Sequence, residues 1–236
     1  MERVFVKNYC PAHRTMKALA FILLSGLMAG SGFGQGTFQN LNFESAVLVP
    51  ISGNPTTVQF GPAFPGWTGY FGLGVLSPTF PANYNNINVG SIGLGLLDQN
   101  SPFGGSISNL TAVLQSSTLN GSPDLALAQT GMVPGGTLSL RFDATTFNPN
   151  FVVSLNGQPL SLSVLQDFGT YKEYGANIAS FGGQTAELRF TKLRASGDLY
   201  FDNVSFSPIA VPEPRSWALL GLGSVLFCCA ARRRRN

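Results

Sequence analysis

Charge, cysteine and histidine are all scarce in this sequence of 236 residues. Only 11% of the residues are charged, against roughly 25% in an average globular protein. Residues 35–210 contain no cysteine and no histidine. This excludes a disulfide, a His- or Cys-ligated zinc site and a Ser-His-Asp or Cys-His catalytic set from that region. A domain there must rely on a hydrophobic core, for which about 175 residues suffice.

Basic residues are scarce in the middle of the chain and frequent at its ends. Residues 35–210 carry five bases and nine acids, a net charge of −4, whereas residues 211–236 carry five bases and one acid. Binding of nucleic acid needs dense positive charge on the folded surface to neutralise phosphates. The mildly acidic middle region therefore disfavours nucleic acid as a partner.

The N-terminal segment has the pattern of a secretory signal peptide. Lys17 precedes a short apolar run over 18–24, and small residues follow that run. We predict a signal peptide over residues 1–34, with Met16 as an alternative start, handled by signal peptidase and the secretion machinery. The other interpretation, a buried helix of the fold, fits the charged flank less well.

The C-terminal segment has the pattern of a short transmembrane helix. Residues 216–231 are uncharged and apolar, and they are followed by Arg232, Arg233, Arg234 and Arg235. As a helix this run would span about 24 Å, somewhat less than the ~30 Å hydrocarbon core. The arginines favour a membrane span, because they stop translocation and can snorkel to the headgroups. A buried core helix and a nucleic-acid signal are the alternatives.

The whole tail, residues 209–236, resembles the PEP-CTERM sorting tail of exported bacterial proteins. The motif Val211, Pro212, Glu213 and Pro214 comes first, and the apolar run and the arginines follow it. The resemblance implies that exosortase, a membrane-embedded enzyme similar to cysteine transpeptidases, recognises the motif and removes the tail near it. The two prolines favour an extended backbone that such an enzyme can reach.

The middle of the chain, residues 35–208, has the pattern of short β-strands. Apolar and polar residues alternate with period two, and glycine and proline interrupt the pattern at short intervals. The alternating segments are 91–96, 138–143, 186–191 and 200–206. Residues 151–155 and 160–164 flank Asn156-Gly157 and predict a hairpin. We predict an all-β fold, a β-sandwich of the jelly-roll type, flanked by the signal helix and the short transmembrane helix.

Both ends of this middle region resemble galactose-binding-like jelly rolls and related carbohydrate-binding modules. The resemblance rests on the opening segment 38–44 and the closing segment 199–206. It implies that Glu44 and Asp202 help to hold a structural Ca²⁺, an ion that prefers oxygen ligands. The closing motif usually has two acids, whereas this chain has Asp202 followed by Asn203. Hydrogen bonding of the two acids to the backbone is the alternative, and no other cofactor is expected.

Two aromatic residues are candidates for ligand binding. Trp67 and Tyr84 lie beside glycine and proline and could stack on a sugar ring. Aromatic residues in such positions more often pack in the core of a β-sandwich, and this is the favoured alternative. The polar loop 81–88 is the best place for a ligand contact.

No catalytic residue is predicted. A pair of carboxylates for glycoside hydrolysis could come from the scattered acids Asp98, Asp124, Asp143, Asp167 and Glu173. A Ser–Lys pair would need Lys172 or Lys192, and nothing in the sequence around them marks a nucleophile.

The sequence thus predicts an exported, non-enzymatic protein of the bacterial cell surface or extracellular matrix, anchored transiently in the inner membrane. Its expected role is structural or adhesive, and an extracellular polysaccharide is the candidate ligand. Two alternatives remain open. The first is a surface carbohydrate-active enzyme that uses a carboxylate pair, and the second is a surface protein that stays anchored through a single membrane span.

Overall fold

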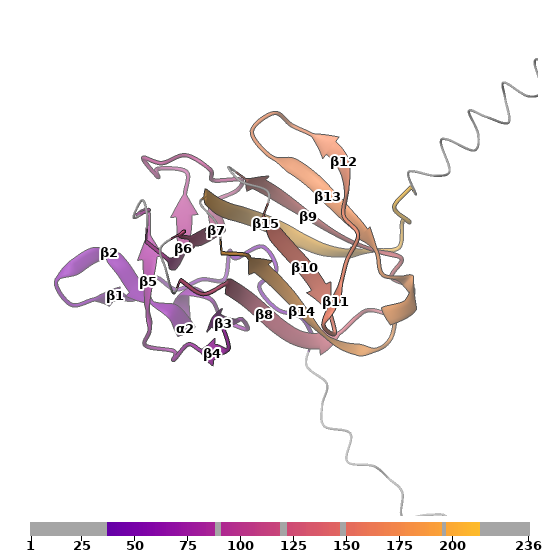
Figure 1. Ribbon diagram of the computed structural model, residues 1–236, viewed down its shortest axis with the longest axis horizontal. Helices are drawn as coiled ribbons and strands as arrows, with labels where there is room; N and C mark the ends of the chain where they lie inside the picture. The colour runs from indigo at the N-terminus through magenta and orange to yellow at the C-terminus, as the bar shows by residue number, and fades with distance from the viewer. Residues whose placement is uncertain (1–36, 88–90, 119–121, 147–149, 195–196, 213–236) are drawn as a thin grey trace, which may run out of the picture. The chain divides into compact units, whose positions relative to one another are not determined.

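The computed structural model describes residues 37–87, 91–118, 122–146, 150–194 and 197–212 (Figure 1). The chain divides into two units, Met1–Gln35 and Gly36–Asn236, and all described residues lie in the second. The predicted signal peptide, the apolar run 216–231 and the four terminal arginines lie outside the described residues. Within the described ranges, no helix is long and apolar enough to cross a membrane.

The described strands form two sheets (Figure 1). The larger sheet contains, in spatial order, β1 (Pro50–Ile51), β2 (Asn54–Gln59), β5 (Pro81–Tyr84), β6 (Gly93–Asp98), β7 (Leu110–Ser116), β15 (Gly197–Ser207), β9 (Ser139–Thr146), β13 (Lys172–Asn177) and β12 (Ser163–Asp167). The smaller sheet contains β11 (Gln158–Pro159), β10 (Phe151–Leu155), β14 (Thr185–Lys192), β8 (Leu125–Met132), β3 (Thr68–Phe71) and β4 (Gly74–Val75). Neighbouring strands are antiparallel except for β5 and β6. Two short helical turns, α2 (Phe60–Ala63) and η1 (Ala179–Phe181), accompany the sheets.

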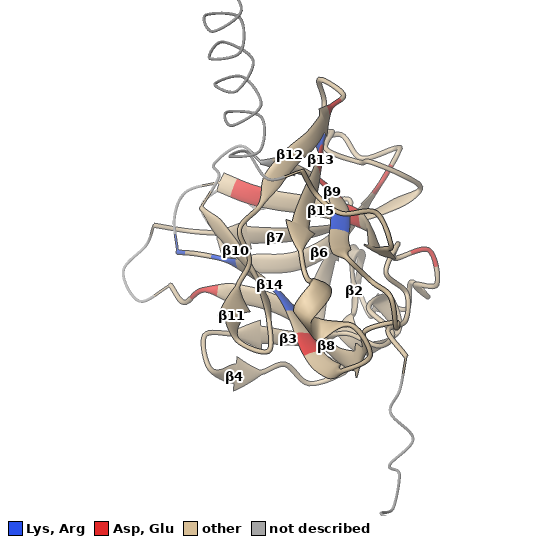
Figure 2. Cartoon of the chain, turned by 90° about the vertical axis from the view of Figure 1, so that its right-hand side faces the viewer, with Lys and Arg blue, Asp and Glu red and all other residues tan. Residues whose placement is uncertain are grey.

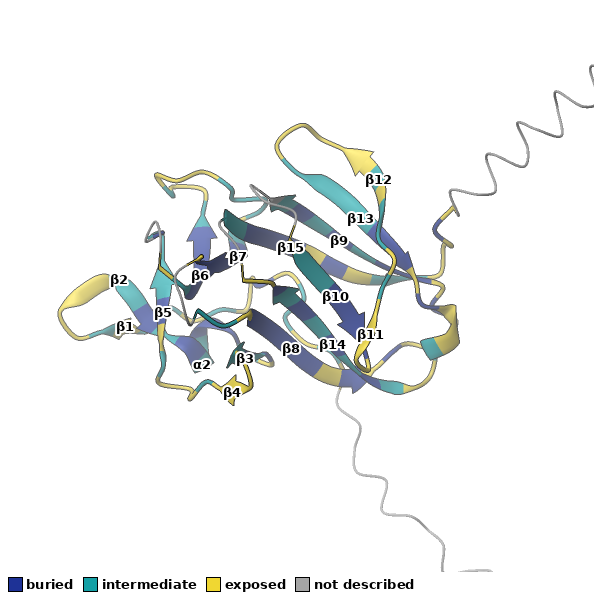
Figure 3. Ribbon diagram, in the orientation of Figure 1, coloured by how far each residue is buried: buried dark blue, intermediate teal, exposed yellow. Residues whose placement is uncertain are grey.

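The core lies between the two sheets (Figure 3). Burial along β14 alternates residue by residue, as the period-two pattern predicts for a strand with one buried face. Phe190 of β14 stacks on Phe201 of β15 with 4.2 Å between ring centroids, and it meets Phe142 of β9 edge-on at 5.1 Å. These rings join the sheets directly. The predicted all-β, two-sheet fold is confirmed.

The hairpin around Asn156-Gly157 is shorter than predicted. Asn156 and Gly157 both have positive φ, as a two-residue hairpin turn requires. The return strand is β11, in which Pro159 pairs with Ser154 of β10. The predicted second arm, 160–164, keeps one bond to β10, from the N–H of Leu160 to the carbonyl oxygen of Val153 at 2.8 Å. Residues from Ser163 onward form β12 at the edge of the larger sheet.

The last strand, β15, contains a bulge that breaks its predicted alternation. Asp202 pairs with Asp143, and Ser205 pairs with Arg141, so two residues of β15 lie opposite one residue of β9. Asn203 has a φ of +51° at this point. The bulge changes which face the following side chains occupy. Core residues before it are Leu199 and Phe201, and Val204 is the core residue after it.

Candidate functional site

Glu44 and Asp202, the two predicted calcium ligands, lie on either side of one serine hydroxyl. Ser108 Oγ is 2.9 Å from Glu44 Oε1 and 2.5 Å from Asp202 Oδ2. The main-chain N–H of Leu110 also donates to Glu44 Oε1, at 3.2 Å. The fold thus brings together two acids that the sequence places near opposite ends of the predicted sandwich.

Asp202 is a fully buried carboxyl group. It accepts hydrogen bonds from Thr111 Oγ1 at 3.2 Å and from the main-chain N–H of Asn203 at 2.7 Å. Burial is the main cause that raises the pKa of Asp202 to about 6. Its hydrogen bonds oppose this shift, whereas the charge of Glu44 adds to it. The cluster of Glu44, Asp202 and Ser108 thus contains two acids and no basic residue.

The Glu44–Asp202 cluster fits a hard cation in the chemical type of its oxygen atoms. Ser108 Oγ lies within 3.3 Å of three acceptors, namely Glu44 Oε1, Asp202 Oδ2 and the carbonyl oxygen of Leu110. A hydroxyl donates only one proton. Further protons come from Thr111 Oγ1 and from the main-chain N–H groups of Leu110 and Asn203. The carboxylate oxygens of the cluster are nevertheless of the chemical type that Ca²⁺ takes as ligands. In the part of the chain that the structure describes, no group of three or more His, Cys, Asp or Glu could hold a metal ion, so neutral oxygens would have to complete the shell.

Trp67 is part of the hydrophobic core. Its side chain is 5% exposed, its ring stacks on Phe43, and it meets Phe190 and Phe201 edge-on. Its indole N–H donates to the carbonyl oxygen of Asn40 at 3.0 Å. The ring is therefore not available to stack on a sugar, contrary to the ligand-binding prediction, and the core-packing alternative applies.

Tyr84 is half-buried and belongs to a hydrogen-bond network at the end of β6. Its hydroxyl donates to Asp98 Oδ2 at 2.6 Å, and Asn85 Nδ2 donates to Asp98 Oδ1 at 2.8 Å. The hydrogen bond with Asp98 is the main cause that raises the pKa of Tyr84 to about 12, and it lowers the pKa of Asp98. The network joins β5 to β6, and a ligand contact by Tyr84 stays a prediction.

The outer face of the larger sheet is covered at two places. Loop 99–109 packs over one part, where a Cβ on Gly105 would lie 2.9 Å from the ring of Tyr200. Tyr200 belongs to a second, small cluster of buried apolar residues: Ile87, Leu97, Val113 and Tyr200. Elsewhere on the sheet, Val211 packs over Gly175 of β13.

A depression of about 320 Å³ lies on this sheet over β9, β13 and β15. Asp143 and Glu173 are direct cross-strand partners in it, a relation that places Cβ atoms about 4.5–5.5 Å apart. Asn203 Nδ2 donates to Asp143 Oδ2 at 3.0 Å, and Arg141 Nη1 pairs with Glu173 Oε1 at 3.3 Å. The complete lining is Arg141, Phe142, Asp143, Phe168, Glu173, Asn203 and Ser205.

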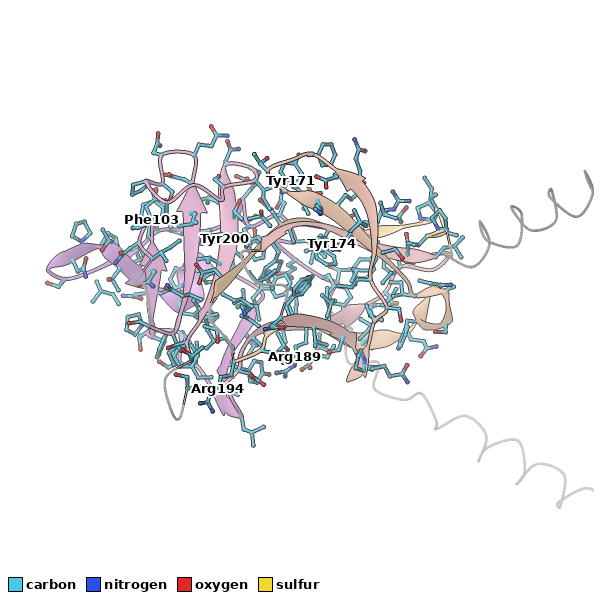
Figure 4. The ribbon with its side chains drawn as sticks, turned by 45° about the horizontal axis from the view of Figure 1, so that its top comes forward. Phe103, Tyr171, Tyr174, Arg189, Arg194 and Tyr200 are labelled. Atoms are coloured by element: carbon cyan, nitrogen blue, oxygen red, sulfur yellow. The ribbon has the colours of Figure 1, made fainter. Side chains whose placement is uncertain are left out.

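An aromatic ring forms the rim of this depression. Phe168, at the tip between β12 and β13, is 45% exposed and stacks on Tyr171 with 4.8 Å between centroids. Thr145 Oγ1 donates to the carbonyl oxygen of Thr170 at 2.6 Å and holds this tip against β9. Figure 4 labels Tyr171 at this tip, away from Phe103 in loop 99–109. The depression therefore has a polar floor and an apolar edge.

Burial governs the electrostatics of the depression. It raises the pKa of Asp143; the hydrogen bond from Asn203 opposes this shift, and the charge of Glu173 adds to it. The lining holds two acids and one base, Arg141. Charged residues are sparse over the described surface as a whole (Figure 2). The depression thus carries one more acidic than basic residue.

The sequence identified Asp143 and Glu173 only as two of five scattered acids. Strand pairing brings these two together and leaves the other three elsewhere. Asp98 is held by Tyr84, Asp167 pairs with Lys172 at 3.1 Å, and Asp124 accepts from the main-chain N–H of Arg194. The alternation of segment 138–143 already predicted that Arg141 and Asp143 share the outward face of one strand. No pattern in the sequence indicated that β13 is the neighbour of this strand or that Phe168 lies beside the two residues.

Neither lysine considered for a Ser–Lys pair contacts a serine through its ammonium group in the described contacts. Lys192 is buried, and its Nζ donates to the carbonyl oxygens of Asn150 and Leu193. Burial lowers the pKa of Lys192. Lys172 is paired with Asp167.

The predicted sorting motif begins within the described fold. Val211 is buried and Pro212 is exposed. Glu213, Pro214, the apolar run 216–231 and the arginine cluster 232–235 lie outside the described residues.

Comparison with family models confirms the tail. Residues 210–235 match the PEP-CTERM protein-sorting motif. The motif identifies an exported, envelope-associated protein that exosortase sorts and processes. No curated protein matches the chain.

Solved structures that match part of this chain come from several kinds of protein. An apo cyclase from Fischerella sp. is 18% identical, covers 72% of this chain and 93% of its own, and gives a TM-score of 0.43. The enzymatically active domain of tailspike protein 4 from bacteriophage CBA120 is 14% identical, with 61% and 19% coverage and a TM-score of 0.35. The module CBM27-1 from Caldicellulosiruptor saccharolyticus, solved with mannohexaose, is 14% identical, with 52% and 87% coverage and a TM-score of 0.31.

Proposed function

We propose that the sandwich binds a neutral extracellular polysaccharide in the depression over β9, β13 and β15, and that the protein has a structural or adhesive role outside the cell. One observation carries the proposal. A floor of carboxylates, an amide and a guanidinium lies beside an exposed aromatic ring, Phe168.

This combination of groups suits a sugar. Asp143 and Glu173 offer acceptors for neighbouring hydroxyl groups, while Asn203 and Arg141 offer donors. Phe168 offers an apolar surface for the C–H face of a pyranose ring. The excess of acids over bases disfavours uronic acids and phosphorylated glycans, because their charge would face Asp143 and Glu173. A neutral glycan is therefore the expected ligand class.

We propose binding without catalysis. In the site, the carboxylate of Glu173 is paired with Arg141 and that of Asp143 is hydrogen-bonded to Asn203. These partners hold both carboxylates in place and leave their other lone pairs for sugar hydroxyls. The competing function is glycoside hydrolysis. It is favoured by the adjacency of the two acids and by the raised pKa of Asp143, which a general acid requires.

A calcium ion is part of the proposal as a structural group. Glu44 and Asp202 would hold it, and the ion would supply the positive charge that the buried Asp202 lacks. A calcium ion held by these residues would link the segment before β1 to loop 99–109 and to β15.

Affinity electrophoresis through gels that contain a neutral glucan, a neutral mannan or an anionic alginate tests the binding proposal. At least one neutral glycan should retard the protein, and alginate should not. Phe168→Ala should weaken binding about tenfold or more, because an aromatic platform is worth of the order of 1–2 kcal/mol. The matched control is Phe103→Ala, since Phe103 is 43% exposed in loop 99–109.

The same samples separate binding from hydrolysis. New reducing ends that disappear in both Asp143→Asn and Glu173→Gln would establish the glycosidase function in place of the binding function. Equal retardation of the two phenylalanine variants would refute the depression as the binding site.

A further inference from the structure

The chain follows a defined path over the outer face of the larger sheet after β15 ends. Ser207 Oγ accepts from the main-chain N–H of Ile209 at 3.1 Å. Ser139 Oγ of β9 then donates to the carbonyl oxygen of Ile209 at 2.6 Å. Figure 1 shows the end of the described chain beside the ends of β9 and β13. These two bonds lead the backbone from β15 across β9.

Val211 ends this path in a small notch on β13. The Val211 side chain is 8% exposed, whereas Ile209 is 64% exposed. A Cβ added to Gly175 would lie 2.8 Å from Val211 Cγ2 and 2.7 Å from Leu165 Cδ1. Gly175 is not among the positive-φ glycines, so close approach explains this glycine better than backbone conformation does. Gly175 and Leu165 thus form a seat shaped for Val211.

The occupant of the seat is the first residue of the sorting motif. Val211 is followed directly by Pro212, Glu213 and Pro214. An enzyme that cleaves near the motif must hold the chain on both sides of the scissile bond. A valine packed against a sheet is not free to enter such a cleft, and its release is a local opening of the fold.

We propose that the seat formed by Gly175 and Leu165 binds the sorting motif through Val211, and that exosortase can process the tail only after Val211 leaves this seat. The inference rests on processing of the tail. Burial of the Val211 side chain favours the docked state over the released state by a factor of roughly ten to one hundred. The seat therefore sets the fraction of precursor that the enzyme can engage.

The first test measures the seat without the enzyme. In the full-length chain, Val211→Cys should react with a maleimide at least about tenfold more slowly than Ile209→Cys, with labelling assigned by peptide mass. Adding Gly175→Val, which fills the notch and leaves the motif intact, should remove most of this difference. Equal labelling rates at positions 209 and 211 in the otherwise native chain would refute the seat.

The second test measures processing in a bacterium that contains exosortase. Pulse-chase labelling should show faster conversion of precursor to mature protein, by up to about tenfold, in Gly175→Val and in Leu165→Ala. Leu165→Ala removes a wall of the seat without a clash, so it keeps the test valid if Gly175→Val does not fold. Val164→Ala is the control, since Val164 is an exposed neighbour on β12.

The two tests fail in different ways. Unchanged conversion in Leu165→Ala, together with faster labelling of residue 211, would refute control of processing by the seat. Absence of conversion in the native chain would refute the processing itself, and the labelling test would still decide whether Val211 is docked.

Discussion

At the scale of single residues, Asp202 shows how burial gives a side chain its properties. It is a carboxyl group without exposure, and it shares the Ser108 hydroxyl with a second acid, Glu44. Removing a charge from water is costly unless another charge or enough hydrogen bonds replace the water. Three hydrogen bonds replace part of that water for Asp202, and a proton or a bound cation would lower the remaining cost, which defines a requirement that can be tested.

Thermal unfolding with and without Ca²⁺ tests this requirement. Calcium should raise the Tm of the native protein by about 5 °C or more, because a ligand that binds only the folded state stabilises it. Asp202→Asn should lose this response. It should also raise the Tm measured in EGTA, because the amide keeps the shape and removes the buried charge.

Asp167→Asn is the control for this experiment. Asp167 is exposed and lies in β12, so its variant should keep the full calcium response. A native protein whose Tm does not change with calcium would contradict the proposed ion.

At the scale of elements, the bulge in β15 builds the depression. It gives Asn203 a positive φ and lets its amide reach Asp143 on β9. Without the extra residue, the strand after Asp202 would continue in the other register. The bulge therefore connects the buried core with the outer, polar face.

Two substitutions at Asn203 separate its backbone role from its side-chain role. Asn203→Ala should destabilise the fold by about 1–2 kcal/mol, because alanine is strained in the left-handed region. Asn203→Gly should cost less, since glycine accepts a positive φ. Chemical denaturation provides the comparison, and an alanine variant as stable as the glycine variant would show that the bulge does not need this conformation.

Both Asn203 variants lose the hydrogen bond to Asp143. Loss of a bond to the charged form raises a carboxyl pKa further. The pKa of Asp143, followed by NMR, should therefore rise in both variants.

At the scale of the whole molecule, the described sandwich and the sorting tail have separate tasks. The sandwich holds the candidate binding site, and the tail carries the sorting motif. They meet at Val211, which belongs to both. Under the proposed docking of Val211, this contact would link the folded domain to the processing of its own tail.

Mass spectrometry of the protein from its native envelope tests that fate. The mature chain should end near residues 211–214, because the motif is the recognition element and the apolar run behind it is short for a stable span. Recovery of a membrane-bound chain that still contains Arg232–Arg235 would instead show the permanently anchored form.

The sequence by itself determined the class of fold and the sorting of the protein. Both depend on local patterns: period-two alternation along β14, and the order of motif, apolar run and arginines in the tail. Such features need no knowledge of which strands are neighbours. The opening and closing acids, Glu44 and Asp202, lie on either side of the Ser108 hydroxyl, and their role as calcium ligands stays a prediction.

Only the tertiary structure decided the site. Asp143 and Glu173 became a pair through the register of β9 and β13, and the bulge at Asn203 supplied their donor. The structure assigns Trp67 to the core and not to a ligand contact, because Phe43 and the neighbouring residues enclose its ring. Strand pairing and burial join residues that are distant in sequence, and local patterns do not contain this information.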